Sequence, residues 1–345
     1  MRILVTGGAG MVGSHAAERW AAAGHEVVVL DNLMRSTLFK SARESVEYNW
    51  RHLETLKRVR LVKGDVRNAK DVEQVLEPSM DVILHAAGQP GVGFSIEDPR
   101  EDFSINALGT LQVLETARRR CPKAVVLYCS TNKVYGTNVD TLSLAEQSTR
   151  YVFGDGLAGV SESLSVDHSG HTPYGVSKLA GELYVQDYAH TYGMRTGVFR
   201  MSCIYGPRQF GFEDQGWVAH FAISTILGRP LTIYGDGKQV RDVLYVDDLI
   251  EAFDQFIASG LPHGLFNVGG GPTQTTSLLE LLDRLEQMTG KRSPVRFHDW
   301  RPNDQRVYIS DVSRLRQALG WQLRIGFQEG LERLVQWVQD RQTLF

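Results

Sequence analysis

The sequence is poor in cysteine, in charge of one sign and in long apolar runs, and each scarcity narrows the class of protein. Its three cysteines, Cys121, Cys129 and Cys203, lack the spacing of a metal site, which predicts a reducing compartment and no metal centre. The net charge of −3 provides no strong field for nucleic acid or a membrane surface. No run approaches the roughly 18 apolar residues of a membrane span, and a strand pattern begins at once. We therefore expect a soluble cytoplasmic protein without a signal peptide.

Short apolar runs alternate with helix-length segments over the first 200 residues. Strands that are apolar throughout are typical of a parallel sheet covered on both faces. The segments at 13–23 and 106–120 have the pattern of crossover helices. This alternation predicts an α/β fold with a doubly wound parallel sheet of the Rossmann type. The expected strands are residues 3–5, 27–30, 59–62, 82–84, 124–128 and 196–199.

The pattern changes after about residue 200, where loops rich in Gly, Pro, Arg and Asp dominate residues 205–214 and 234–242. Helical patterns return at 277–289 and 326–341. We expect a large domain over residues 1–200 and a smaller α/β domain over residues 201–345, from which some strands return to the large domain. The long segment 137–172 is expected to be a functional loop or to be partly structured.

A glycine-rich segment joins the first strand to the first helix. Gly7, Gly10 and Gly13 have the spacing of a dinucleotide-binding turn, in which the backbone approaches the pyrophosphate at the helix amino end. Asp31 ends the second strand, where it can accept from ribose hydroxyls and would repel a 2′-phosphate, so NAD is predicted. Arg35 nearby is the feature that would favour NADP.

Two further strand ends support the same site. Asp65 follows the third strand and is expected near the adenine, and the small residues after His85 let backbone approach the cofactor. For His85 itself, packing is favoured over catalysis. The predicted cofactor-binding residues are Gly7, Gly10, Met11, Val12, Asp31, Asn32, Arg35, Asp65, Val66, Ala86, Ala87, Gly88, Tyr174 and Lys178.

Groups able to move protons follow the strand at 124–128 and lie in a later helix. Thr131, directly after this strand, places a hydroxyl at the carboxyl end of the sheet. Tyr174 and Lys178 are four residues apart and so share one face of a helix. A lysine cation stabilises a nearby phenolate and lowers its pKa. Tyr174 is therefore a candidate acid and base for a substrate hydroxyl.

Together these motifs resemble the extended short-chain dehydrogenase/reductase family that acts on nucleotide sugars, over nearly the whole chain. The resemblance implies that Tyr174 is the acid and base, that Lys178 binds the nicotinamide ribose and lowers the pKa of Tyr174, and that Thr131 holds the reacting hydroxyl. The motifs that carry it are the glycine turn, Asp31-Asn32-Leu33, Gly64-Asp65-Val66, His85-Ala86-Ala87-Gly88, Asn106, Tyr174 with Lys178, Arg200, Tyr205-Gly206-Pro207-Arg208 and Arg241-Asp242-Val243.

The residues after Thr131 narrow the reaction. Family members that eliminate water carry an Asp-Glu pair there, whereas this chain has Asn132 and Lys133, so we reject dehydration. The resemblance is closest to the C2 epimerases of CDP-linked hexoses within the family, with Pro90-Gly91 as a departure. The motifs of that branch are Ser130-Thr131-Asn132-Lys133-Val134-Tyr135-Gly136, Ala87-Gly88-Gln89, Arg208-Gln209-Phe210 with Asp214-Gln215-Gly216-Trp217, and Asp304-Gln305-Arg306.

These observations predict an isomerase that oxidises C2 of a nucleotide-linked hexose and reduces the ketone on its opposite face, with NAD retained. A 4-epimerase on the same catalytic residues is the open alternative. Net oxidoreduction and a non-catalytic NAD-binding protein are disfavoured, the latter because both Tyr174 and Lys178 are present. The resemblance also implies a homodimer or homotetramer, paired through helices beside the Tyr-Lys helix.

Substrate-binding residues are expected from both halves of the chain. Arg241 has the planar guanidinium that matches a diphosphate, and Arg301 is a second candidate. Lys133 could face the site or pair with a loop carboxylate. The first domain would then bind NAD and the second mainly the nucleotide sugar. The predicted catalytic residues are Thr131, Asn132, Tyr174 and Lys178, and the predicted substrate-binding residues are Gln89, Thr131, Asn132, Lys133, Arg208, Gln209, Gln215, Trp217, Arg241 and Arg301.

Overall fold

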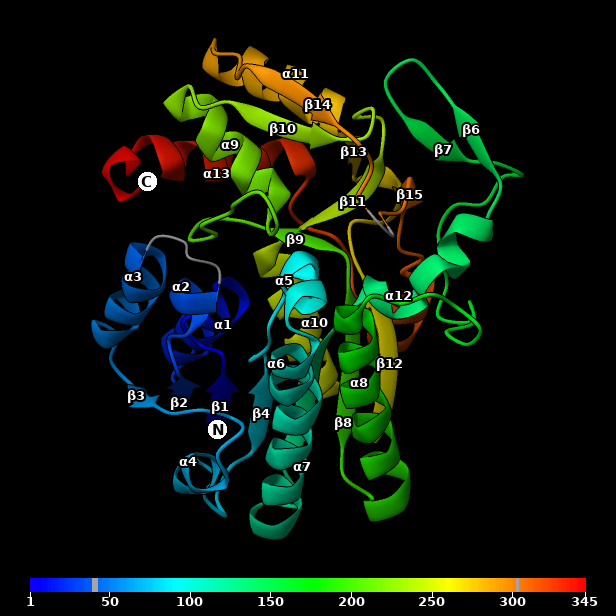
Figure 1. The fold of residues 1–345 in the computed structure, drawn as a ribbon. Helices are drawn as coiled ribbons and strands as arrows, with labels where there is room; N and C mark the ends of the chain where they lie inside the picture. Colours follow the sequence, from blue (N-terminus) through cyan, green and yellow to red (C-terminus); the bar gives the residue numbers. More distant parts are fainter. Residues whose placement is uncertain (39–42, 302–303) are drawn as a thin grey trace. The chain divides into compact units, whose positions relative to one another are not determined.

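The computed structural model describes residues 1–38, 43–301 and 304–345, which form two compact units (Figure 1). The first unit comprises Met1–Val134, Thr172–Arg200 and Ile250–Phe266, and the second comprises Tyr135–His171, Met201–Leu249 and Asn267–Phe345.

The chain passes between the units at residue 200, and two segments lie on the other side of this division, so the expected division into two domains stays a prediction. Tyr135–His171 belongs to the second unit, where the Tyr135 hydroxyl donates to Asn267 Oδ1 at 2.7 Å. Ile250–Phe266 belongs to the first unit, because the strand at its end lies beside Thr196–Met201 in the large sheet. The tasks predicted for the two domains stay predictions.

The helices and strands alternate through the first half of the chain. In order, the elements up to Met201 are β1 Arg2–Thr6, α1 Met11–Ala22, β2 Glu26–Asp31, α2 Arg35–Leu38, α3 Arg43–Glu54, β3 Val59–Lys63, α4 Ala69–Val75, β4 Val82–His85, α5 Val92–Glu97, α6 Pro99–Phe103, the π-helix η1 Ser104–Leu108, α7 Gly109–Arg120, β5 Val125–Thr131, the 3-10 segment η2 Asn132–Thr141, β6 Leu144–Glu146, β7 Tyr151–Phe153, α8 Pro173–Tyr192 and β8 Thr196–Met201. The later elements are β9 Cys203–Tyr205, α9 Trp217–Leu227, β10 Leu231–Tyr234, β11 Val240–Tyr245, α10 Val246–Ser259, β12 His263–Val268, η3 Gly271–Thr273, β13 Thr275–Ser277, α11 Leu278–Thr289, β14 Val295–His298, β15 Val307–Tyr308, α12 Ser313–Leu319, α13 Phe327–Gln339 and η4 Gln342–Leu344.

The first unit is built on a seven-stranded sheet with the order β12-β8-β5-β4-β1-β2-β3, which confirms the predicted doubly wound fold. Strand β1 pairs in parallel with both β2 and β4, and the strand order reverses between β1 and β4. Ligands of such sheets bind at the carboxyl ends of the strands at this reversal. Thr6, His85 and Leu30 share one register there, so the side chains after these residues meet at one edge.

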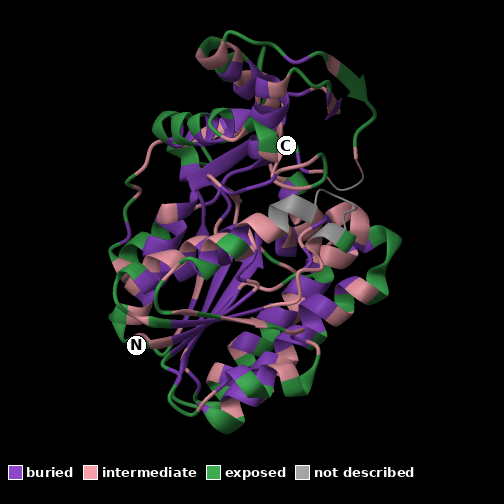
Figure 2. Cartoon of the chain, turned by 90° about the vertical axis from the view of Figure 1, so that its left-hand side faces the viewer, coloured by how far each residue is buried: buried purple, intermediate pink, exposed green. Residues whose placement is uncertain are grey.

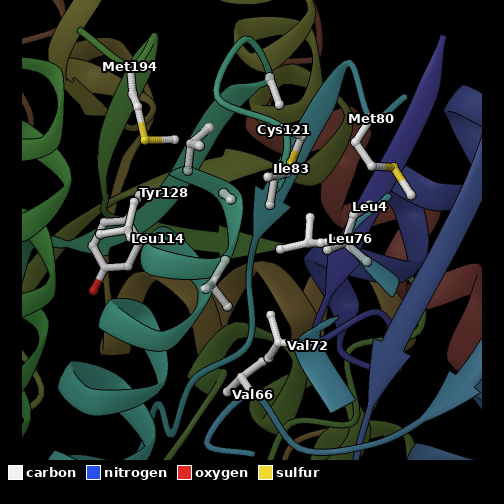
Figure 3. Packing of buried hydrophobic residues seen from close by; sticks show 14 of the residues in the cluster. Leu4, Val66, Val72, Leu76, Met80, Ile83, Leu114, Cys121, Tyr128 and Met194 are labelled. Atoms are coloured by element: carbon white, nitrogen blue, oxygen red, sulfur yellow. The ribbon is translucent and has the colours of Figure 1, made fainter. Parts of the chain in front are cut away.

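Alternate residues of the strands pack on opposite faces of this sheet, as the pleat requires. Leu4, Ile83 and Tyr128 face one side and form a buried core with Val72 of α4 and Leu114 of α7 (Figure 3). Apart from the edge strand β3, the sheet strands are buried along most of their length, and exposed residues lie mainly on the helices and loops (Figure 2). This two-sided burial explains why these strands are largely apolar.

The second unit contains smaller sheets. Strand β11 pairs with β9, β13 and β15, β10 pairs with β14, and β6 pairs with β7 within the segment predicted to be partly structured. The expectation of a loop over residues 234–242 is wrong at its end, because β11 begins at Val240. The apolar residues Val240, Val243 and Leu244 are buried, which stabilises this segment as a central strand.

The helices of the described ranges include none with the length and apolarity needed to pass through a membrane. Cys121 and Cys129 are buried among apolar residues. Cys203 is half-buried, and its sulfur accepts a hydrogen bond from Trp217 Nε1 at 3.2 Å.

Candidate active site

The glycine turn after β1 leaves no room for side chains. Gly7 has a φ of 72°, and a Cβ there would lie 2.5 Å from the backbone nitrogen of Ala87. A Cβ at Gly13 would lie 2.4 Å from the Gly7 carbonyl oxygen. Gly10 precedes α1 and offers no side chain to cap it. Backbone N–H groups at the start of a helix are a binding site for phosphate, and glycine at these positions lets a ligand approach them.

The acidic residues beside this turn are held in place by hydrogen bonds. Asp31 accepts from the backbone N–H groups of Ala9 at 2.9 Å and Leu33 at 2.8 Å, which ties the glycine turn to the end of β2. Loss of water on burial raises the pKa of Asp31. Asp65 accepts from Asn32 Nδ2 at 2.9 Å, so the ends of β2 and β3 are joined as well.

The other predicted cofactor residues of this region lie close by in sequence. Arg35 begins α2, and burial lowers its pKa to about 10. Met11 lies in the first turn of α1 and is nearly buried, and Val12 follows it. Val66 is buried against Gly109, where a Cβ would lie 2.8 Å from Val66 Cγ2.

The turn after β4 packs against both the glycine turn and the Tyr-Lys helix. Ala86 and Ala87 donate backbone hydrogen bonds to Thr6, at 3.1 Å to its carbonyl and 3.3 Å to its hydroxyl. A Cβ at Gly88 would lie 3.8 Å from Lys178 Nζ. A Cβ at residue 88 would also lie 3.0 Å from Asn106 Oδ1, so glycine there leaves space between this turn and the side chains of Asn106 and Lys178.

His85 is a buried neutral residue. Its ring nitrogens hydrogen-bond the hydroxyls of Thr6 at 2.7 Å and Thr110 at 3.0 Å. Burial, with the nearby Lys178 cation as a smaller cause, lowers the pKa of His85 to about 3. A ring with both nitrogens engaged and no charge at neutral pH supports the predicted packing role.

The candidate catalytic side chains meet at the end of β5 and the start of α8. Thr131 is the last residue of β5, and its hydroxyl acts on the phenol of Tyr174 by lowering the phenol's pKa. The Thr131 hydroxyl also accepts from the Lys133 backbone N–H at 3.2 Å and lies 3.4 Å from Asn132 Oδ1. Helix α8 begins at Pro173, and Lys178 lies one turn beyond Tyr174.

Lys178 is buried against the aromatic ring of Tyr128, with Nζ 4.3 Å from the ring centroid. Burial lowers the pKa of Lys178 to about 8. Burial also raises the pKa of Tyr174 to about 12, against the lowering by the Thr131 hydrogen bond. Removal of water from the phenol thus outweighs the contacts that lower its pKa, and the lowering of the Tyr174 pKa by Lys178 stays a prediction.

A buried polar network lies beneath this pair. Asn106, in the π-helix η1, donates to Asp102 Oδ1 at 3.0 Å and to Ser177 Oγ at 3.1 Å. Gln89 Nε2 donates to the same Asp102 oxygen at 2.9 Å and to the Gly91 carbonyl at 2.8 Å. These contacts assign the Gln89 side chain to the turn after β4, and its predicted substrate contact stays a prediction.

Sequence analysis missed Asp102 and Ser177. Asp102 is fully buried, and its position four residues before Asn106 is the signal that could have placed both side chains on one helix face. Ser177 stands next to Lys178, and its hydroxyl donates to the Tyr174 carbonyl at 3.1 Å.

An ion pair fixes α8 against the sheet. Glu182 accepts from Arg200 Nε at 3.1 Å and from the Ser130 hydroxyl at 2.8 Å, and all three side chains are buried. Because Ser130 precedes Thr131 and Glu182 lies one turn after Lys178, this pair sets the position of the tyrosine and lysine relative to the end of β5.

The predicted loop residues of the second unit come together around the start of α9. Gln209 is buried, and its Nε2 donates to the Ile204 carbonyl at 3.0 Å. A Cβ at Gly216 would lie 3.0 Å from the same Gln209 nitrogen. Arg208, beside it, is buried and has a φ of 62°, a conformation unfavourable for residues other than glycine. Trp217 begins α9 and packs edge to face on Phe221.

Arg301 contacts this loop region through Asp214, whereas Arg241 lies apart from it on β11. Arg301 pairs with Asp214 at 2.8 Å and stacks over Tyr234 with its guanidinium carbon 4.0 Å from the ring centroid. Gln215 follows Asp214, and its backbone N–H donates to the Phe212 carbonyl at 3.0 Å.

Arg241 lies on β11 and is buried, and it donates to Asp304 Oδ1 at 2.7 Å. The resemblance motif that contains Asp304 thus contacts the predicted diphosphate-binding arginine directly. Pro302 and Asn303, beside Arg301 in the sequence, lie outside the described residues.

The geometry is that of a dinucleotide site beside a tyrosine-lysine pair, and comparison with known proteins gives it a family. Residues 3–269 match the NAD dependent epimerase/dehydratase family, and the chain belongs to it. The chain is 37% identical to a CDP-paratose 2-epimerase of Salmonella typhi, over 99% of this chain and 100% of that protein. It is 33% identical to a UDP-glucose 4-epimerase of Mycolicibacterium smegmatis, over 99% of each.

A solved structure shares the fold. The UDP-glucose 4-epimerase of Thermus thermophilus in complex with NAD superposes with a TM-score of 0.80 and 32% identity, covering 99% of this chain and 100% of that chain. NAD is the cofactor of this chain as well. The close-packed glycine turn and the anchored Asp31 carboxylate fit the pyrophosphate and ribose of this cofactor.

Proposed function

We propose that this protein epimerises C2 of a CDP-linked hexose, with CDP-paratose and CDP-tyvelose as the pair of sugars, by transient oxidation to a 2-keto sugar. The observation that carries the reaction type is the Thr131 hydroxyl, which lowers the pKa of the Tyr174 phenol, together with buried Lys178 one turn beyond Tyr174 and an amide at residue 132. The 37% identity to a CDP-paratose 2-epimerase over the full length supports the carbon and the nucleotide.

In the proposed mechanism the residues move one proton and stabilise one oxygen. Tyr174, as phenolate, removes the proton of the C2 hydroxyl, and the Thr131 hydroxyl donates to the oxygen that becomes a ketone. Bound NAD would supply the hydride acceptor and donor for C2. Lys178, as ammonium, would stabilise the phenolate and hold the nicotinamide ribose. After the keto sugar turns, Tyr174 returns the proton to the oxygen at C2.

The absence of an acid after Thr131 favours epimerisation over dehydration. Elimination of water needs a group that protonates the leaving hydroxyl and a base that removes a carbon-bound proton. Asn132 cannot donate a proton as an acid, and an ammonium at Lys133 cannot act as the base. Asn132, which lies beside the Thr131 hydroxyl, is proposed to hydrogen-bond the sugar.

The two units are proposed to divide the ligands. The first unit carries the glycine turn, Asp31 and the Tyr-Lys pair, and is proposed to bind NAD. The second carries Arg208, Arg241 and Arg301, whose guanidinium groups suit a diphosphate, and is proposed to bind the nucleotide end.

A homodimer or homotetramer is part of the same proposal. Helix α8 exposes apolar side chains that would be covered by a second copy, and an isologous pairing of this helix would bury them. These side chains are Val176, Leu183, Tyr184 and Tyr192, each more than two fifths exposed.

The alternative is a nucleotide-sugar 4-epimerase, which the 33% identity to a UDP-glucose 4-epimerase favours. Proton NMR of the sugar C1, C2 and C4 signals separates the two. The protein is incubated without added cofactor with CDP-paratose, CDP-glucose or UDP-glucose. Inversion at C2 of a CDP-sugar without net NADH supports the proposal. Inversion at C4 of the UDP-sugar, with both CDP-sugars unchanged, overturns it.

A further inference from the structure

We propose that Asp214 sets the affinity of the second unit for a nucleoside diphosphate, because its carboxylate competes with the diphosphate for the guanidinium of Arg301. The inference rests on the proposed function, in which Arg301 belongs to the diphosphate site. It goes further by giving a role to an acidic turn that the proposed reaction steps do not use.

The competing carboxylate lies at the tip of a tight turn in the second unit. The backbone N–H groups of Phe212 and Gln215 each donate to the other residue's carbonyl, both at 3.0 Å. Glu213 and Asp214 are the two residues between them, so the turn presents two adjacent carboxylates just before α9.

Both carboxylates of this turn lie near the same guanidinium. Arg301 Nη2 is 2.8 Å from Asp214 Oδ1 and 3.7 Å from Glu213 Oε1. The same nitrogen donates to the Glu213 backbone carbonyl at 3.4 Å. Two carboxylates therefore surround one guanidinium, and their excess of negative charge opposes the approach of a diphosphate.

Tyr234, at the end of β10, holds the arginine and one of the two carboxylates. The guanidinium carbon of Arg301 lies 4.0 Å from the centroid of the Tyr234 ring, and the Tyr234 hydroxyl donates to Glu213 Oε1. This hydrogen bond raises the pKa of Tyr234, so the phenol stays a neutral donor. Glu213 is thus held by the tyrosine, and Asp214, the nearer carboxylate, is the direct competitor for Arg301.

The pair of Arg301 with Asp214 is suited to exchange because water reaches both side chains. They are 33% and 48% exposed, and ion pairs of this kind contribute little to stability. A diphosphate carries more charge, and its oxygens match the planar guanidinium. The pair of Arg241 with Asp304 differs, because its side chains are 9% and 24% exposed and a buried pair is costly to break.

Asp214→Asn tests the competition, because it removes the charge and nearly keeps the size of the side chain. The dissociation constants of CDP and UDP are measured by isothermal titration calorimetry at low ionic strength, with the full-length protein at equal NAD content. We expect the variant to bind both diphosphates about two- to fivefold more tightly than the wild type, the range that a partly exposed ion pair allows. Asp214→Glu, which keeps the charge, should bind them like the wild type.

A double-variant comparison shows whether the gain passes through Arg301. In an Arg301→Leu background, Asp214→Asn should leave the dissociation constants unchanged, because the carboxylate then has no guanidinium to compete for. Asp167→Asn, an exposed change of the same charge in the second unit, is the matched control and should bind like the wild type. Asp214→Ser is a second neutral variant should the amide fail to fold.

Unchanged or weaker binding by a folded neutral variant overturns the inference, and so does an equal gain in the Arg301→Leu background. Because CDP and UDP share the diphosphate, the result is independent of which sugar carbon is epimerised. Binding of UDP without CDP would contradict the proposed nucleotide, while the competition is still decided with UDP. Failure of every variant to bind either diphosphate would refute both the competition and the diphosphate role of Arg301.

Discussion

At the scale of single residues, burial sets the protonation state of the active-site groups. The phenol of Tyr174 has a pKa raised to about 12, and the ammonium of Lys178 has one lowered to about 8. Both shifts come first from loss of water, which disfavours the charged form of either group. In the proposed mechanism, catalysis by this pair would therefore depend on charges supplied by its neighbours.

Tyr174→Phe should lower kcat by about 10²–10⁴-fold, the usual contribution of one general acid or base. It should leave bound NAD unchanged, because the glycine turn and Asp31 are intact. Turnover is followed by NMR, and NAD is measured by absorbance after denaturation. Tyr184→Phe, on the exposed side of the same helix, is the control and should retain full activity. Near-normal turnover of Tyr174→Phe would contradict the role assigned here.

At the scale of elements, helix α8 is joined to the sheet by charge as well as by apolar packing. Arg200 on β8 and Ser130 on β5 both donate to Glu182, one turn beyond Lys178. A buried ion pair is costly to break because the remaining partner keeps its charge without compensation. The catalytic helix is thus positioned by a contact outside the active site.

Glu182→Gln should destabilise the protein by about 3 kcal/mol, since the Arg200 cation stays buried opposite a neutral amide. The free energy of unfolding is measured by urea denaturation at pH 7. Asp187→Asn, an exposed change on the same helix, should alter it by no more than about 0.5 kcal/mol. The double variant Glu182→Gln with Arg200→Met should lose less free energy of unfolding than Glu182→Gln alone. If Glu182→Gln and Asp187→Asn changed the free energy of unfolding equally, the Glu182-Arg200 pair would add nothing to stability.

At the scale of the whole molecule, the candidate ligand-binding residues fall into two separate units. The glycine turn and the Tyr-Lys pair belong to the first, and the arginines suited to a nucleotide diphosphate belong to the second. This separation makes the two binding events experimentally distinguishable, because a change in one unit should leave the other ligand in place.

Arg241→Ala should raise KM for the nucleotide sugar much more than it lowers kcat, because the diphosphate does not take part in the chemical step. The NAD content of the purified protein should not change. Steady-state kinetics and NAD absorbance provide both values, and Arg316→Ala, an exposed change in the second unit, is the control. An unchanged KM, or loss of NAD, would refute the assignment of Arg241 to the diphosphate.

Six strands of the large sheet, the glycine turn and the Tyr174-Lys178 spacing could be predicted because each is a local pattern, whereas the seventh strand, β12, was not predicted. Apolar runs of strand length indicate two-sided burial wherever they lie, and a four-residue spacing places two side chains on one helix face. NAD and the family were both predicted from such patterns and from their order along the chain. The comparisons confirm both predictions.

Other features depended on residues distant in sequence that only the tertiary structure brings together. Asp102 accepts a hydrogen bond from Gln89, which no local pattern connects to it. The burial that raises the pKa of Tyr174 could not be predicted, because it depends on the whole packed unit. Arg241 was predicted on a loop, yet its strand is stabilised by pairing with β9, β13 and β15. Sequence by itself determined the fold class and the chemistry available, and tertiary structure decided which side chains meet and in which charge state.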